Sequence, residues 1–155
     1  MGFLTAVGIT IGVLAGIWAQ VSGYVGLLAW VGFIAWACFF AAGGKTDGLV
    51  KGMLANLSGV FWGWLIIMIM GLMPNFPYAL GVAVVFPAFM MCVQANFKYL
   101  SFIPGAFCGA AAYFGSGLDI KATAISLICG ALLAFASEWL ALKMTKKEAA
   151  AEESK

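Results

Sequence analysis

The chain has 155 residues, of which 65% are hydrophobic and 9% are charged, and its formal net charge is +2. Soluble domains contain about a quarter charged residues, so this chain cannot cover a water-facing surface, which excludes a soluble enzyme. Eight lysines and no arginine do not make the basic surface that nucleic-acid binding needs, which excludes a nucleic-acid-binding protein. The high hydrophobicity excludes a disordered chain. The class that remains is an integral membrane protein.

Six apolar stretches approach the roughly 20 residues that a bilayer-spanning helix needs. In chain order they are 3–19, 24–42, 52–72, 78–95, 100–115 and 122–142. Glycine, proline or asparagine separates each from the next. The runs are continuous, whereas barrel strands alternate polar and apolar residues. The sequence therefore predicts an all-α integral membrane protein with a six-helix domain over 1–142 and a polar cytoplasmic tail over 143–155.

The lysines predict the orientation of these helices, because cytoplasmic loops collect basic residues. With both termini in the cytoplasm, only Lys121 lies on the outer side. The inner side then holds the other seven, at positions 45, 51, 98, 143, 146, 147 and 155. An even number of helices puts both ends on one side, which agrees with this topology.

Glycine pairs at one-turn spacing recur along the chain, 47 and then 46 residues apart. The pairs are Gly12 and Gly16, Gly59 and Gly63, and Gly105 and Gly109. A lysine also follows Cys38, Cys92 and Ser137 at nearly constant spacing. These signals predict three repeated helical hairpins, with the glycines allowing close helix packing. The alternative is that these spacings arise by chance from the glycine-rich composition of ordinary membrane helices.

Glu138 is the only carboxylate inside a predicted span. A buried carboxyl group of this kind can bind a neutral solute or carry a proton. The alternative is that it lies at the interface, solvated or paired with a lysine. Gln94, Ser58 and Asn56 are further candidate solute contacts, although headgroup water would satisfy amides near the inner boundary.

Aromatic residues complete the candidate solute contacts. Trp62 and Phe107 stand in the glycine motifs and would narrow a pore, and Phe40 and Trp139 lie near the ends of their helices. The alternative for each is that it only faces lipid or fills space in the core. An aromatic belt at the membrane interface explains Trp139 well. The four cysteines show neither metal-ligand spacing nor a disulfide framework, and histidine is absent. The sequence thus predicts no enzyme, no cofactor and no metal site.

The segments 38–44, 56–60 and 104–107 read CFFAAGG, NLSGV and PGAF. They resemble a family of small bacterial inner-membrane proteins catalogued as domain of unknown function 1097, and the resemblance covers nearly the whole chain. It implies a multi-pass protein of the bacterial inner membrane.

The predicted hairpins also resemble the architecture of the proton-gated urea and amide channels and of the acetate–succinate transporters. That resemblance implies a hexameric or trimeric ring with a solute path through each protomer, and Glu138 as the counterpart of a carboxylate on the last helix. The chain departs from these families because it has no histidine and no Asn-Pro-Ala-Pro-Leu-Gly signature.

The sequence favours a channel or facilitator for a small neutral or weakly acidic solute such as urea, an amide or acetate. Two alternatives remain: a non-transporting membrane partner or assembly subunit, and a proton-coupled transporter that uses Glu138. The expected partners are the lipid bilayer, further copies of the chain and the solute, and no nucleic acid.

Overall fold

The computed structural model describes residues 2–153, with side chains up to Lys147, and every regular element in that range is helical. The elements are α1 (Phe3–Tyr24), α2 (Ala29–Ala41), α3 (Lys45–Gly71), α4 (Ala79–Val93), the 3-10 turns η1 (Gln94–Asn96) and η2 (Lys98–Leu100), α5 (Ile103–Gly115) and α6 (Ile120–Glu153). The prediction of an all-α membrane protein is confirmed at this level. Past Leu142, α6 continues to Glu153, so the segment predicted as a polar tail prolongs that helix.

Four helices, α1, α3, α6 and α4 extended by η1, are long and apolar enough to cross a membrane. The other two, α2 and α5, have 13 residues each. At 1.5 Å per residue each is roughly 20 Å long, against a hydrocarbon core of about 30 Å. The predicted six spanning helices are therefore not confirmed.

The two short helices begin later in the chain than the sequence predicts. The stretch predicted over 24–42 contains a turn at Gly26, which has a φ of +69° and separates α1 from α2. The stretch predicted over 100–115 begins in η2, and α5 begins only at Ile103, just before Pro104. Proline suits the first turn of a helix because its missing N–H would be unpaired there in any case.

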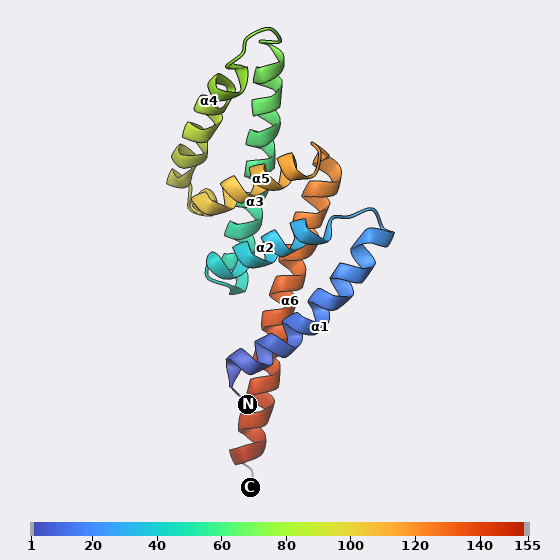
Figure 1. The fold of residues 1–155 in the computed structure, drawn as a ribbon. Coiled ribbons are helices and arrows are strands. Elements are labelled where there is room, and N and C mark those ends of the chain that lie inside the picture. Colours follow the sequence, from blue (N-terminus) through green and yellow to red (C-terminus); the bar gives the residue numbers. More distant parts are fainter. Residues whose placement is uncertain (1, 154–155) are drawn as a thin grey trace.

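The chain forms two halves that run in opposite directions (Figure 1). The first half consists of α1, α2 and α3, and its two long helices lead away from the N-terminal end. The second half consists of α4, α5 and α6, and its long helices lead back. Each half has a short helix between two longer ones. This arrangement is an internal repeat with inverted direction.

Each short helix packs mainly on a long helix of the other half. The short helix of the first half, α2, packs mainly on α6, and the short helix of the second half, α5, packs mainly on α3. The outer helices follow the same rule, because α1 packs on α6 and α4 packs on α3. Within the pairs α1–α2 and α5–α6 contact is slight. The predicted repeat of three hairpins is thus not confirmed, and the packing repeats by halves instead.

Glycines permit the two crossings between the halves. A Cβ atom on Gly59 of α3 would collide with the backbone of Ala106 on α5. A Cβ atom on Gly130 of α6 would collide in the same way with Gly32 on α2. The two collisions are equivalent, since each joins a long helix to the short helix of the other half. The helices approach closely because neither glycine carries a side chain.

The main core cluster lies where the halves meet. It is formed by residues of α2, α3, α5 and α6, namely Val31, Ala35, Val60, Ala112, Tyr113, Leu127 and Ala131. Most large apolar side chains of α1 and α4 point outward instead, such as Val13 and Phe89. Such an outer surface suits a lipid environment, where apolar side chains need no cover.

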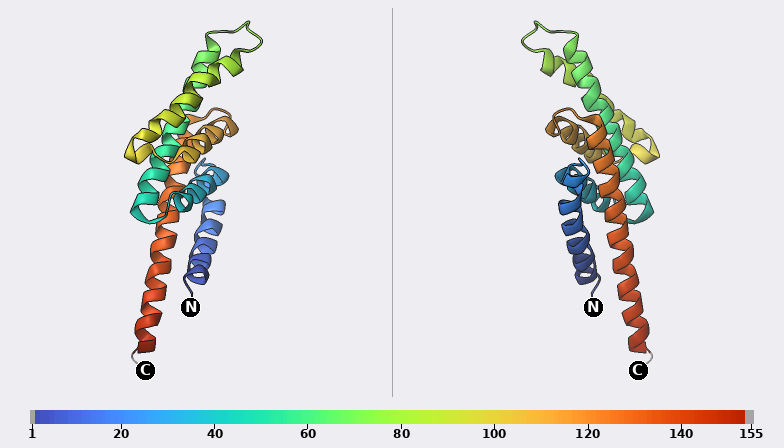
Figure 2. Two further views of the ribbon diagram at one scale, coloured as in Figure 1. Left: turned by 90° about the vertical axis from the view of Figure 1, so that its left-hand side faces the viewer. Right: turned by 90° about the vertical axis from the view of Figure 1, so that its right-hand side faces the viewer.

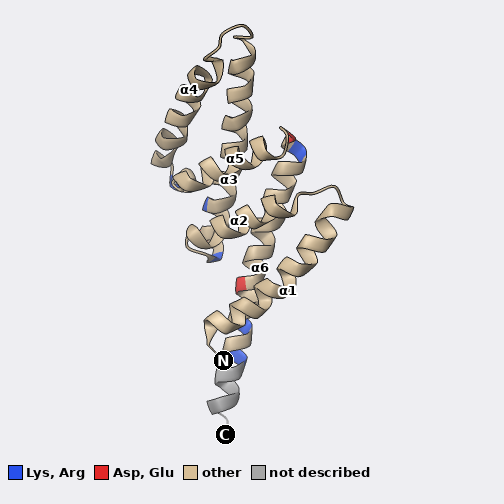
Figure 3. Ribbon diagram, in the orientation of Figure 1, with Lys and Arg blue, Asp and Glu red and all other residues tan. Residues whose placement is uncertain are grey.

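The molecule is elongated, with the α3–α4 turn at one end and the C-terminal part of α6 at the other (Figure 2). The first turn of α1 lies near the C-terminal part of α6, so the first helix begins at the end of the molecule where the last helix finishes (Figure 1). Charged residues are few and stand mainly near helix ends (Figure 3). The exceptions are Glu138, Lys143, Lys146 and Lys147, which all lie inside α6.

Candidate functional site

Three of the predicted solute contacts, Ser58, Trp62 and Gln94, lie together where α3 passes the end of α4. Ser58 and Trp62 are four residues apart on α3 and so share a face. The Trp62 indole N–H donates to Gln94 Oε1 at 2.8 Å. Gln94 Nε2 donates to Ser58 Oγ at 3.0 Å, and the Ser58 hydroxyl donates to the Ala55 carbonyl at 2.8 Å. We call Ser58, Trp62 and Gln94 the polar triad.

Gln94 is the buried member of the polar triad, whereas Ser58 and Trp62 are half-buried, and the triad still has hydrogen-bonding capacity. Gln94 exposes 5% of its surface. Its amide carries two protons and its carbonyl oxygen two lone pairs, and the bonds to Trp62 and Ser58 use one of each. The remaining proton and lone pair suit a solute that both donates and accepts. No charged side chain takes part in these three bonds.

An apolar pocket lies between α3, α4 and α5, and none of its lining residues belongs to the polar triad. Its volume is about 230 Å³, and it is lined by Ile66, Val84, Ala88, Met91, Phe107, Ala110, Ala111 and Phe114. Trp62 packs against the cluster of Met91, Ala106 and Ala110, two of which also line the pocket. Phe107, a predicted contact, lines this pocket and does not belong to the triad. Sequence reasoning missed Met91, which has no polar group to single it out.

Glu138 lies elsewhere, at the first turn of α3. Its Oε2 accepts a hydrogen bond from the Lys45 backbone N–H at 2.6 Å, and only 9% of the residue is exposed. Gly44, with a φ of +67°, leaves the space that the carboxylate occupies, since a Cβ atom there would lie 2.6 Å from Glu138 Oε1. The carboxylate thus caps a helix of the other half, where the helix dipole favours a negative charge.

The other candidates do not join the polar triad. Asn56 is two residues from Ser58, about 200° around α3, and is fully buried toward α2 and α5. Trp139 is 47% exposed, with Lys143 Nζ 3.7 Å from its ring centroid. Phe40 packs edge-on against Phe39 with ring centroids 5.0 Å apart. The eight predicted contacts therefore belong to several places in the fold.

The predicted packing glycines divide into two groups. Gly59, Gly63, Gly105 and Gly109 face α5 or α3 at close range. Around the Cβ positions of Gly12 and Gly16 no atom lies within 4 Å. Their side of α1 faces outward in the described chain, so their packing role stays a prediction.

Comparison with known proteins places the chain in a family. Residues 8–142 match the model of a protein family of unknown function, DUF1097. The inner membrane protein YcdZ of Escherichia coli is 37% identical, over 94% of this chain and 93% of the relative. The uncharacterized protein YahC of the same organism is 33% identical over 94% and 95%.

YcdZ of Salmonella typhimurium is 34% identical over 96% of each chain. No solved structure matches the chain. The apolar helices agree with the inner-membrane location that these relatives' names state. The chain belongs to the DUF1097 family of membrane proteins.

Proposed function

We propose that this protein is a channel or facilitator that passes a small neutral or weakly acidic solute across the bacterial inner membrane. The observation that carries the proposal is the inverted repeat, in which each half places a short helix across a long helix of the other. Many solute transporters are built from inverted repeats, with interrupted helices and a binding site at the repeat interface. The inner membrane is the location named for the relatives.

The polar triad supports a solute of the urea, amide or short carboxylic acid type. Such molecules carry a carbonyl beside N–H or O–H groups, which complement the free lone pair and proton of Gln94. A hydrogen-bonding pocket rejects a solute that lacks the matching group, because its own buried polar atoms would stay unpaired. Trp62 packs against Met91 and Ala110, which line the pocket of about 230 Å³, and this pocket would accept the short apolar part of an amide or acid.

Flux measurements with purified protein in lipid vesicles test this proposal. Uptake of urea, acetamide and acetic acid should exceed that of empty vesicles for at least one solute. Replacing Gln94 with Leu should lower that uptake by about 3- to 10-fold, the worth of one hydrogen bond. Gln20→Leu is the matched control, because Gln20 is exposed and bonds only to Tyr24 among the described residues. Uptake equal to that of empty vesicles for the whole panel would refute the proposal.

The same preparation addresses the remaining parts of the proposal. We infer a homo-oligomer, a ring of three or six copies, and native mass spectrometry of the purified protein counts the subunits. We also infer that both termini face the cytoplasm. Reporter fusions at each terminus test that orientation, and an external reporter signal at either one would refute it.

A non-transporting partner or assembly subunit is the second candidate. It is favoured by the apolar lining of the pocket between α3, α4 and α5, and of another formed by Ile17, Trp18, Val21, Cys129, Leu132 and Leu133. Such walls also suit lipid chains or a partner helix. Flux no higher than that of empty vesicles, together with a stable co-purifying membrane protein, would support this candidate. Uphill accumulation driven by a proton gradient would instead indicate the coupled transporter.

A further inference from the structure

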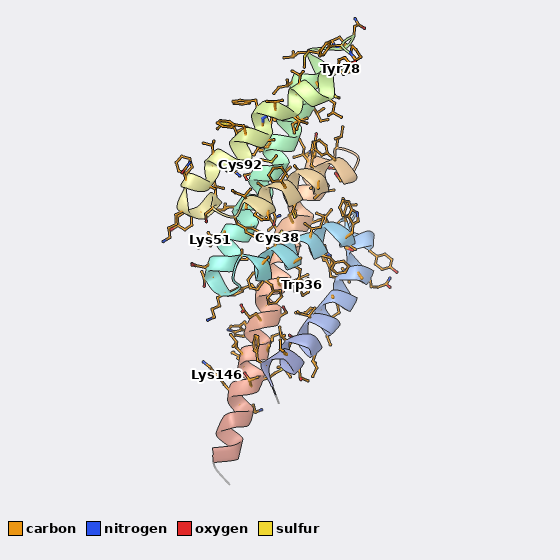
Figure 4. The ribbon with its side chains drawn as sticks, turned by 60° about the vertical axis from the view of Figure 1, so that its left-hand side comes forward. Trp36, Cys38, Lys51, Tyr78, Cys92 and Lys146 are labelled. Carbon is orange, nitrogen blue, oxygen red and sulfur yellow. The ribbon has the colours of Figure 1, made fainter. Side chains whose placement is uncertain are left out.

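Three lysines lie together on the C-terminal part of α6. Lys146 and Lys147 follow Lys143 by three and four residues, so the three share one face of the helix, and all are exposed. We call them the lysine cluster, and Figure 4 shows Lys146 on this part of α6. Lys143 Nζ lies 3.7 Å from the ring centroid of the exposed Trp139. Tryptophan is enriched at the membrane interface, so this is where the lysine cluster belongs.

No carboxylate among the described side chains neutralises the lysine cluster. Glu138 is the only acidic residue of α6 whose side chain is described, and it accepts its hydrogen bond from the Lys45 backbone. It precedes Lys147 by nine residues, which is about 2.5 helical turns, so it lies on the opposite face of α6. The ion pair between described side chains is that of Lys51 and Asp47 on α3. The lysine cluster is therefore a patch of positive charge.

An exposed stripe of α6 leads from the lysine cluster to an apolar pocket. The stripe consists of residues three or four positions apart that precede Lys143 on the same face, namely Leu140, Ala136, Leu133, Leu132 and Cys129. Each of them is exposed or half-buried, so no helix of the described chain covers the stripe completely. The pocket lies between α1 and α6, has a volume of about 370 Å³, and is lined by Ile17, Trp18, Val21, Cys129, Leu132 and Leu133.

The chemistry and the depth of this α1–α6 pocket suit an acyl chain. The Trp18 indole N–H already donates to the Ala29 carbonyl at 2.9 Å, and the other lining side chains are aliphatic apart from the thiol of Cys129. Leu132 precedes Lys143 by 11 residues, which is about 16 Å along the helix. One leaflet contributes about 15 Å to a hydrocarbon core of about 30 Å. The pocket therefore lies one chain length from the lysine cluster.

We propose that the lysine cluster and the α1–α6 pocket together bind one phospholipid with a negatively charged headgroup. The headgroup phosphate lies on the lysine cluster, one acyl chain follows the exposed stripe, and the end of that chain fills the pocket. Charge complementarity selects an anionic lipid, because each lysine near a membrane surface strengthens the binding of such lipids about 5-fold. This inference does not depend on the proposed solute or on transport.

Native mass spectrometry of the purified protein tests the headgroup. The protein in detergent is offered equal amounts of phosphatidylglycerol and phosphatidylethanolamine that carry the same acyl chains. Three lysines at about 5-fold each predict that the anionic lipid is retained in an excess of about 100-fold. Lys143→Gln should lower this ratio about 5-fold, and replacement of all three lysines with Gln should abolish the preference. Lys98→Gln is the matched control, because Lys98 is also exposed and also lies over an aromatic ring, that of Tyr99.

A pair of tryptophan variants tests the acyl chain. Ile17→Trp fills the α1–α6 pocket and should lose most of the bound phosphatidylglycerol. Val13→Trp adds the same bulk one turn earlier on α1, outside the pocket lining, and should retain the lipid. Both positions are exposed, as are the three lysines, so every variant should fold.

Four results would overturn the proposal. The first is equal retention of the two lipids by the original chain, and the second is an unchanged preference after all three lysines are replaced. The third is an equal loss of lipid in Ile17→Trp and Val13→Trp, which would remove the chain from the pocket. The fourth is a bound acidic membrane protein in place of lipid, captured by the original chain but not by the chain without the three lysines. Glycerol 3-phosphate serves as the chain-free headgroup, and its retention would likewise overturn a lipid site in favour of a free phosphate ligand.

Discussion

The cap that Glu138 places on α3 makes a quantitative prediction about stability. Glu138→Ala removes the acceptor of the 2.6 Å bond from the Lys45 N–H, at a carboxylate that is 9% exposed. Loss of a helix cap costs about 0.5–2 kcal/mol, and a hydrogen bond to a charged group contributes about 1.5–3 kcal/mol. We therefore expect the free energy of unfolding to fall by about 2 kcal/mol. Glu138→Gln keeps an acceptor without the charge and should cost about half as much.

Asp47 provides a matched control for this prediction. It lies in the same first turn of α3, but its side chain is 80% exposed and, among the described residues, pairs only with Lys51 at 3.5 Å. An exposed pair of this kind contributes at most about 1 kcal/mol, so Asp47→Ala should lower stability less than Glu138→Ala does.

Reversible unfolding in mixed micelles, followed by circular dichroism, measures these differences. Equal losses for Glu138→Ala and Asp47→Ala would refute the capping role. The same variants distinguish a cap from a proton-carrying group in flux assays. A cap predicts that Glu138→Gln leaves the pH profile of uptake unchanged, whereas a proton carrier predicts that the profile changes while stability does not.

Two further predictions concern helix packing and use the same unfolding assay. Gly59→Ala forces a Cβ atom against the backbone of Ala106 and should cost about 1–3 kcal/mol, while Gly12→Ala meets open space and should change stability by less than about 1 kcal/mol. Equal effects would contradict the close crossing. Thr10→Val removes a 2.8 Å bond to the Ser137 carbonyl and should cost about 0.6 kcal/mol, the average for such bonds between membrane helices; an unchanged stability would remove that bond from the α1–α6 contact.

The candidate site was partly predictable. Ser58 and Trp62 share a face by their spacing alone, so their proximity follows from the helix. Their contact with Gln94 depends on the α3–α4 turn folding back and could not be read from spacing. Glu138 was predictable as a buried carboxylate, but its partner lies 93 residues away in sequence.

The class of protein and most helix positions follow from the sequence, because continuous apolar runs and their glycine and proline breaks are local properties. It overestimated the lengths of α2 and α5, since hydropathy does not mark the turn at Gly26 or the start set near Pro104. The repeat by inverted halves is visible only in the folded chain. The helices are apolar almost all round, so no polar stripe indicates which face packs inward. The faces are selected by contact between backbones, which Gly59 and Gly130 permit, while Gly12 lies in open space.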